Sequence, residues 1–153
     1  MNRINLNNVC IKYAKIFERK VKSVLRDKNK VASGNTLRSI LAKAFNKENS
    51  SGFYLYANKT FEYIETGRKS GKPPRVSAIL RWIQQKPVSI KYNLPKEKAA
   101  RLISKAIGKD GIDPTDITEQ ALSKILPGLI KEASVAYIKD IEIAIKTGKK
   151  NVN

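Results

Sequence analysis

The chain has 153 residues, the length of one domain, and its 31 Lys and Arg against 13 Asp and Glu give a net charge of +18. It contains no histidine, which removes the commonest general base and most transition-metal sites. Its single cysteine, Cys10, excludes an internal disulfide and a multi-cysteine zinc site.

The positive charge is concentrated towards the N-terminus. Residues 1–47 hold 12 basic and 2 acidic side chains, whereas residues 96–153 hold 11 and 8. Such a field favours an acidic partner, namely nucleic acid, an anionic membrane surface or an acidic protein. No stretch approaches the ~18 apolar residues of a membrane span, and no secretory signal is recognisable. We therefore expect a soluble protein made in a reducing cytoplasm.

Residues 6–26 have apolar side chains at helical spacing, which predicts a long amphipathic helix. Its other side is basic, and residues 1–30 are expected to form a basic N-terminal helical segment. A helix lying on a membrane surface would have the same pattern, but a core-facing helix with a solvated basic face is favoured. The basic face of this helix consists of Lys12, Lys15, Arg19, Lys20, Lys22 and Arg26.

The next segments predict a second helix and a strand. Leu37, Ile40, Leu41 and Phe45 fall on one side of a short helix that begins near Gly34, with Asn35 or Thr36 as its N-cap. Residues 53–57 are rich in aromatic side chains and read as a strand. Residues 61–65 continue either as strand or as one helical turn.

The middle of the chain combines a basic Gly/Pro loop, residues 67–74, with a helix over residues 76–86 that Pro87 ends. Val76, Ile79, Leu80 and Ile83 are predicted to form the buried side of this helix. Residues 88–94 alternate loosely and could pair as a strand with residues 53–57.

The C-terminal part predicts two more helices. Pro95 opens one over residues 96–107, which Gly108 and Gly111 should end. The last covers residues 118–146, and Pro127-Gly128 should kink or split it. The whole is expected to be a helix-rich α+β single domain over residues 1–147, with long N- and C-terminal helices packed on a small antiparallel sheet. Residues 148–153 should form a frayed basic tail.

The stretch Tyr63–Lys86 contains the most tempting site. Three residues separate its glycines, Gly67 and Gly71, whereas a phosphate-binding P-loop needs four between its glycines, followed by Lys and a hydroxyl residue. Pro73 stands where that hydroxyl is required, so no P-loop is predicted. The acidic spacing fits no calcium loop, and neither a catalytic residue nor a cofactor or metal is expected.

This stretch is instead predicted to be a stiff, charged turn that contacts a neighbouring subunit or DNA. Basic clusters can neutralise phosphates, and Trp and Arg are enriched at interface hot spots. Core packing is an equally good interpretation of the single tryptophan, and ion pairing with the basic loop explains Glu62 and Glu65. The predicted contact residues are Glu65, Arg68, Lys69, Lys72, Pro73, Pro74, Arg75 and Trp82.

The order of segments resembles the tail-completion, or head–tail joining, proteins of tailed bacteriophages. Five pieces carry the likeness: SGNTLRSI (33–40), YLYANKTFEYIETGRKSGKPP (54–74), VSAILRWIQQK (76–86), AARLISKAIGKDGIDP (99–114) and ALSKILPGLIKEASVAYIKDIE (121–142). Residues 115–117 depart from it, because the family often has an aromatic there, and Lys59-Thr60-Phe61 is longer than the usual link.

The resemblance implies a structural virion protein of the phage neck, made in the bacterial host and acting without catalysis or cofactor. It implies a homo-oligomeric ring, six- or twelvefold, around the DNA channel, in contact with portal, adaptor or tail proteins and with packaged DNA, and with no membrane partner. The alternative from the residues alone is a small basic nucleic-acid-binding protein.

Overall fold

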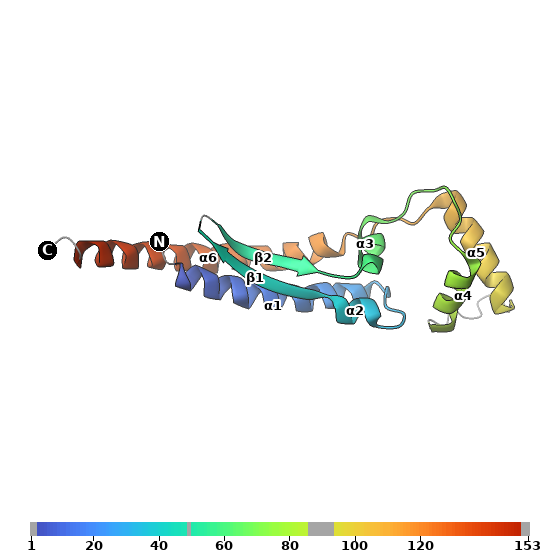
Figure 1. The fold of residues 1–153 in the computed structure, drawn as a ribbon, viewed down its shortest axis with the longest axis horizontal. Coiled ribbons are helices and arrows are strands. Elements are labelled where there is room, and N and C mark those ends of the chain that lie inside the picture. The colour runs from blue at the N-terminus through green and yellow to red at the C-terminus, as the bar shows by residue number, and fades with distance from the viewer. Residues whose placement is uncertain (1–2, 49, 86–93, 151–153) are drawn as a thin grey trace. The chain divides into compact units, whose positions relative to one another are not determined.

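The computed structural model describes residues 3–48, 50–85 and 94–150. These residues form helices and one two-stranded antiparallel sheet, which confirms the predicted helix-rich α+β class (Figure 1). The elements are α1 (Ile4–Asp27), α2 (Asn35–Ser39), β1 (Leu41–Lys47), β2 (Ser50–Tyr56), α3 (Lys59–Thr66), α4 (Val76–Gln85), α5 (Lys96–Asp110) and α6 (Ile117–Lys150).

The chain divides into two compact units. Unit 1 consists of Met1–Val24, Ile40–Tyr56 and Ile117–Asn153, and unit 2 consists of Leu25–Ser39 and Ala57–Asp116. The chain therefore passes back and forth between the units. The expected single domain over residues 1–147 stays a prediction.

Unit 1 is built from the long terminal helices and the β-hairpin. The predicted first helix is confirmed as α1, and its apolar side buries Tyr13, Phe17 and Val21. Phe17 packs on Phe53 of β2, with ring centroids 5.5 Å apart. α6 runs antiparallel to α1, because Asp140 bonds to Asn5 near the start of α1 while the earlier α6 residues contact positions further along it.

The predicted helix through residues 36–45 is wrong in its second half. α2 ends at Ser39, and Leu41 begins β1, which pairs with β2 in the register Leu41↔Tyr56 to Lys47↔Ser50. Leu41 and Phe45 lie on one face of this strand, and Ala42 and Ala44 lie on the other. Their backbone N–H and C=O groups pair with β2. The predicted strand at 53–57 is confirmed as part of β2, but its partner is β1. The strand proposed for residues 88–94 lies almost wholly outside the described residues.

Unit 2 contains α3, α4 and α5. α3 shows that residues 61–65 are helical, and the Asn58 side chain caps this helix by accepting the Phe61 N–H at 3.1 Å. α4 packs against α5, with Ile83 and Ala100 both buried. α5 continues through Gly108 and ends at Asp110, so the predicted end near residue 107 is about three residues too early, whereas Gly111, at φ +79°, follows the last residue of the helix as predicted.

Helix α6 is continuous over 34 residues with Pro127 inside it, so the helix is not split there, and the alternative of a kink stays a prediction. It also includes residues 148–150, so the predicted frayed tail is wrong for these residues, while residues 151–153 lie outside the described part. The stop predicted at Lys86 and Pro87 lies outside it as well.

Candidate contact surfaces

The loop between α3 and α4, residues 67–75, belongs to unit 2 and is named the strap. Arg68 and Ile112 exchange two backbone hydrogen bonds of 2.8 Å each, forming an isolated antiparallel bridge. The Gly71 N–H donates to the Gly108 carbonyl at 2.7 Å. The Ser104 hydroxyl, which is buried, donates to the Pro74 carbonyl at 2.6 Å. The strap is therefore held at three points by α5 and the segment that follows it.

The glycines of this region are required by close backbone packing. A Cβ on Gly67 would lie 2.3 Å from the Ile112 carbonyl oxygen, and one on Gly111 would lie 2.3 Å from that of Arg68. Both glycines also have positive φ, which side chains disfavour. A Cβ on Gly108 would lie 2.7 Å from Pro73 Cγ. Gly71, the second glycine of the spacing that excluded a P-loop, would bring a Cβ within 4 Å of no atom, but its φ of +144° disfavours a side chain there.

The predicted contact residues of the strap differ in their exposure and in their hydrogen bonds. The Arg68 guanidinium donates to the Lys72 carbonyl, so this cation closes the strap on itself. Lys69, Lys72 and Arg75 are exposed, whereas Pro74 is half-buried. Three cations on a rigid loop can therefore meet an acidic partner.

Two other predicted contact residues lie on the helices that precede and follow the strap. Glu65 is half-buried at the end of α3, and its carbonyl accepts the Thr115 N–H at 3.2 Å. Trp82 lies on α4 and is 37% exposed. Of the four residues predicted to form the buried side of α4, Ile83 is buried and Val76 is exposed, so the apolar side of this helix is only partly covered.

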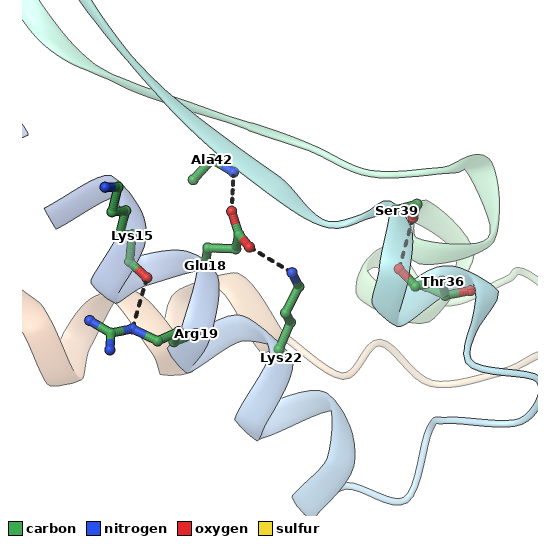
Figure 2. A network of polar contacts seen from close by, with 7 residues as sticks. All are labelled: Lys15, Glu18, Arg19, Lys22, Thr36, Ser39 and Ala42. Atoms are coloured by element: carbon green, nitrogen blue, oxygen red, sulfur yellow. Dashed lines mark hydrogen bonds and ion pairs between the residues drawn. The ribbon is translucent and has the colours of Figure 1, made fainter. Parts of the chain in front are cut away.

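Five of the six cations on the predicted basic face of α1 are exposed and Lys22 is half-buried, and two of the six bind carboxylates of the same unit. Lys12 Nζ lies 2.7 Å from Glu132 on α6, and Lys22 Nζ lies 2.6 Å from Glu18. The Glu18 carboxylate also accepts the Ala42 N–H at 3.0 Å and so joins α1 to β1 (Figure 2). The remaining cations of this face, Lys15, Arg19, Lys20 and Arg26, are all exposed.

Hydrogen bonds lower the pKa of both carboxyl groups in these ion pairs. The bond from Lys22, followed by that from the Ala42 N–H, lowers the pKa of Glu18. The bond from Lys12 lowers the pKa of Glu132 and outweighs the opposing effect of desolvation. Glu132 also accepts the Tyr13 hydroxyl at 3.1 Å. Both carboxyl groups thus stay ionised at neutral pH and hold the N-terminal helix in unit 1.

The hairpin carries a surface that sequence reasoning missed. On its outer face, Tyr54 and Tyr56 are exposed and lie opposite Lys43 and Leu41. Tyr54 stacks on Phe45 with ring centroids 4.5 Å apart. The outer hairpin face consists of Leu41, Lys43, Phe45, Lys47, Ser50, Gly52, Tyr54 and Tyr56. This face carries aromatic rings and two lysines but no carboxylate. The sequence signal that could have predicted it is the alternation of residues 41–47 between the two faces of a strand.

No group of three or more His, Cys, Asp or Glu that could hold a metal ion occurs in the described ranges. In that same part of the chain, no helix is both long and apolar enough to cross a membrane. No protein family, curated protein or solved structure matches the chain.

Proposed function

We propose that this chain is a structural virion protein of a tailed bacteriophage that forms a ring in the neck or tail-completion complex. In this role six or twelve copies encircle the DNA channel and bind portal, adaptor or tail proteins. One observation carries the proposal: residues from two of the five phage-like segments meet at the strap, where they make its closest contacts.

The residues of the family pattern that meet at the strap come from distant parts of the sequence. Gly67, Gly71 and Pro73 belong to the segment 54–74, and Gly111, which packs against the strap, belongs to the segment 99–114. Gly67 and Gly111 each occupy a position where a Cβ would lie under 3.0 Å from a neighbouring atom. The residues behind the resemblance are therefore those that close the strap, which supports a shared fold of unit 2 over a coincidence of short motifs.

The exposed side of the strap suits a component with charged neighbours. Lys69, Lys72 and Arg75 are exposed on a loop fixed by backbone bonds, so that little backbone conformational entropy is lost when they bind. A ring contact is heterologous, joining one face of a subunit to a different face of the next. The strap and the exposed edge of Trp82 are proposed as one of these faces.

The ring is tested by native mass spectrometry and negative-stain electron microscopy of the purified full chain. We expect closed rings of six or twelve copies, and the variant K69E/K72E/R75E should lose them while keeping its helical circular dichroism. The matched control is K96E/K98E/K105E, which makes the same charge change at exposed positions of α5. A protein that stays below six copies at tens of micromolar, or rings that survive the strap variant unchanged, would contradict this assignment.

A second candidate function, nucleic-acid binding, is favoured by the outer hairpin face. Bases stack on exposed aromatic rings in single-strand-binding proteins, each contributing about 1–3 kcal/mol, while nearby lysines neutralise phosphates. Tyr54, Tyr56, Lys43 and Lys47 supply both kinds of contact on one face.

This candidate is tested by fluorescence anisotropy with a labelled single-stranded oligonucleotide at several salt concentrations. Binding should weaken steeply with salt, and Y54A/Y56A should weaken it about tenfold or more at fixed salt. The control Y63A removes an exposed tyrosine outside the hairpin. An equal effect of Y63A, or no binding near physiological salt, argues against a base-stacking site.

A further inference from the structure

The β-hairpin of unit 1 has two edges, and they differ in what covers them. Each edge of a two-stranded sheet presents a row of backbone N–H and C=O groups that cannot pair within the sheet. In the part of the chain that the structure describes, the sheet consists of β1 and β2, and β1 is the one element whose backbone runs alongside that of β2. The hydrogen bonds of each strand therefore show which edge is covered.

The edge of β1 is covered by helix α1. The Ala42 N–H donates to the Glu18 carboxylate at 3.0 Å, so it points away from β2 and towards α1 (Figure 2). Strand β1 also carries Lys43 and Lys47. Charged side chains of this kind protect natural edge strands from pairing with other chains. The edge of β1 is thus both capped and protected by charge.

The edge of β2 is open. Ala42 pairs with Leu55, and because Ala42 points away from β2, the backbone groups of Leu55 point away from β1. Those of Phe53 and Ser51 point the same way, because the direction repeats at every second residue. No backbone group of these three residues has a hydrogen-bond partner elsewhere in the described ranges. These groups form the open edge, and β2 holds neither a charged residue nor a proline that would protect it.

The chemistry of the open edge selects an extended strand as its occupant. Its N–H and C=O groups repeat about every 7 Å, which is the spacing of alternate residues in a strand. Another edge strand presents donors and acceptors at the same spacing, whereas a helix uses its backbone groups internally. The occupant is therefore a strand that has an open edge of its own.

A second copy of this chain supplies such a strand. If two β2 strands run antiparallel about a two-fold axis at Phe53, each Ser51 faces Leu55 of the partner subunit. The two Phe53 residues then face each other, and every N–H and C=O group of both open edges is bonded. A shift of the register by two residues would leave some of these groups without a partner.

Charge and closure also favour a second copy. Two copies with a net charge of +18 repel each other, but β2 is uncharged, so they can meet at this strand without opposing cations on it. Each hairpin has one open edge, and a pair uses both. The sheet then ends at four strands with α1 at each outer edge, so it cannot grow further by edge pairing.

We propose that β2 pairs antiparallel with β2 of a second copy of this chain, about a two-fold axis at Phe53, to form a four-stranded sheet. The contact is isologous and is separate from the heterologous contact that a ring needs. It does not depend on the proposed function.

The first test links the two strands through S50C/Y56C. Both residues are exposed, and in the proposed pair each Ser50 faces Tyr56 of the partner subunit, with Cα atoms about 4.5 Å apart, which suits a disulfide. Within one chain the two positions are about 20 Å apart along β2, so the bond can form only between copies. Under oxidation S50C/Y56C should run as a covalent dimer on a non-reducing gel.

The single variants are the matched controls for this link. S50C and Y56C should each stay monomeric on the gel, because the two copies of either cysteine lie about 20 Å apart, whereas a mixture of both variants should form the dimer. Wild type, whose Cys10 is buried, gives the background. Failure of S50C/Y56C to link, or equal linking by a single variant alone, overturns the proposal.

The second test measures the mass of the purified full chain by analytical ultracentrifugation between about 0.1 and 50 µM. Wild type should be a dimer or an assembly with an even number of copies. S51P removes an N–H of the open edge, and by symmetry removes it twice, so the dimer should dissociate at least about 30-fold more readily. The hairpin's own ladder does not use this N–H, so helical circular dichroism should be unchanged.

The matched control is S51A, which removes the hydroxyl that bonds Asn46 but keeps the backbone N–H, and it should change dissociation by less than about threefold. The strap variant K69E/K72E/R75E should also remain a dimer, because it alters the ring contact alone. Equal effects of S51P and S51A overturn the proposal. A wild-type monomer at every concentration does so too, because the open edge would then be left to water or to a strand of another protein.

Discussion

Asp140 caps a helix that begins 136 residues earlier in the chain. Helix α1 has no acidic residue in its first turn, and the Asp140 carboxylate, which is 1% exposed, takes that place. It accepts the Asn5 N–H at 3.0 Å, the Asn5 side-chain amide at 2.8 Å and the Leu6 N–H at 2.9 Å. It thereby satisfies N–H groups that the first turn of a helix leaves without partners.

Replacing Asp140 with alanine should therefore lower the free energy of unfolding by about 2–3 kcal/mol, because two backbone donors lose a charged acceptor. D140N should recover part of this loss through its amide oxygen. The measurement is urea unfolding followed by circular dichroism. E142A, two residues further along α6 and exposed, is the control and should change stability by less than about 0.5 kcal/mol. A D140A loss no larger than that of E142A would show that α1 needs no cap.

Acid should destabilise the protein through the same carboxylates. Burial acts to raise the pKa of Asp140, but hydrogen bonds from Leu6 and Asn5 and the charge of Arg3 prevail and lower it. The pKa values of Glu18 and Glu132 are also lowered in the folded state. The unfolded chain therefore takes up protons at a higher pH than the folded one, and stability decreases as the pH falls.

The loss should begin near pH 5, where the unfolded carboxyl groups with ordinary pKa values of 3.8 and 4.5 start to protonate, and continue as the folded-state pKa values are passed. Urea midpoints at pH 7, 5, 4 and 3 measure it. The decrease should be smaller in D140N, which has no carboxyl group at this position. A midpoint that is constant or rises from pH 7 to pH 3 would contradict the carboxylate assignment.

At the scale of elements, the sequence predicts a helix best where one side is buried and the other is charged. α1 meets this condition, because Tyr13, Phe17 and Val21 alternate at helical period with lysines and arginines. Residues 36–45 do not, because Leu41 and Phe45 fit a helix and a strand equally well, and only β2 decides between them. α6 was found from its period, but a helix apolar on two sides does not reveal which side its own unit covers.

In the strap, too, the sequence predicts the local conformation but not the packing. The stiffness of the Gly/Pro turn follows from Gly67, Pro73 and Pro74, whereas the residues that the turn hydrogen-bonds to do not follow from the sequence. The pairing of Arg68 with Ile112 joins residues that are 44 positions apart in the sequence. No hydrophobic periodicity or sequence motif predicts such a bridge. The sequence did identify exposed cations at Lys69, Lys72 and Arg75, because short charged loops between helices lie at the surface.

Alanine at Gly67 or Gly111 should destabilise unit 2 by about 3 kcal/mol or more, because the new Cβ would overlap a backbone carbonyl at a positive φ. Trp82 is the only tryptophan of the chain and lies in unit 2, so its fluorescence during urea unfolding reports this unit.

The control for this pair is G148A, whose Cβ meets no atom within 4 Å, and which should be neutral or stabilising by up to about 1 kcal/mol. If G67A and G111A unfold at the same urea concentration as G148A, the strap is not packed as closely as described.

At the scale of the whole molecule, the net charge of +18 opposes the compact state by self-repulsion. The ion pairs Lys12–Glu132 and Lys22–Glu18 act in the other direction, but the first is exposed and such pairs contribute about 0–1 kcal/mol. Repulsion among many like charges extends further than a single contact, and salt near 0.15 M screens it beyond about 8 Å.

Raising sodium chloride from about 0.02 to 0.3 M should therefore stabilise the folded chain by about 1 kcal/mol, or roughly 3 °C in melting temperature. The variant K15E/K20E reverses two exposed cations of α1 and lowers the net charge from +18 to +14. It should melt higher than wild type in low salt and respond less to added salt. A melting temperature that falls with salt would contradict this prediction and would mean that the local ion pairs outweigh the repulsion.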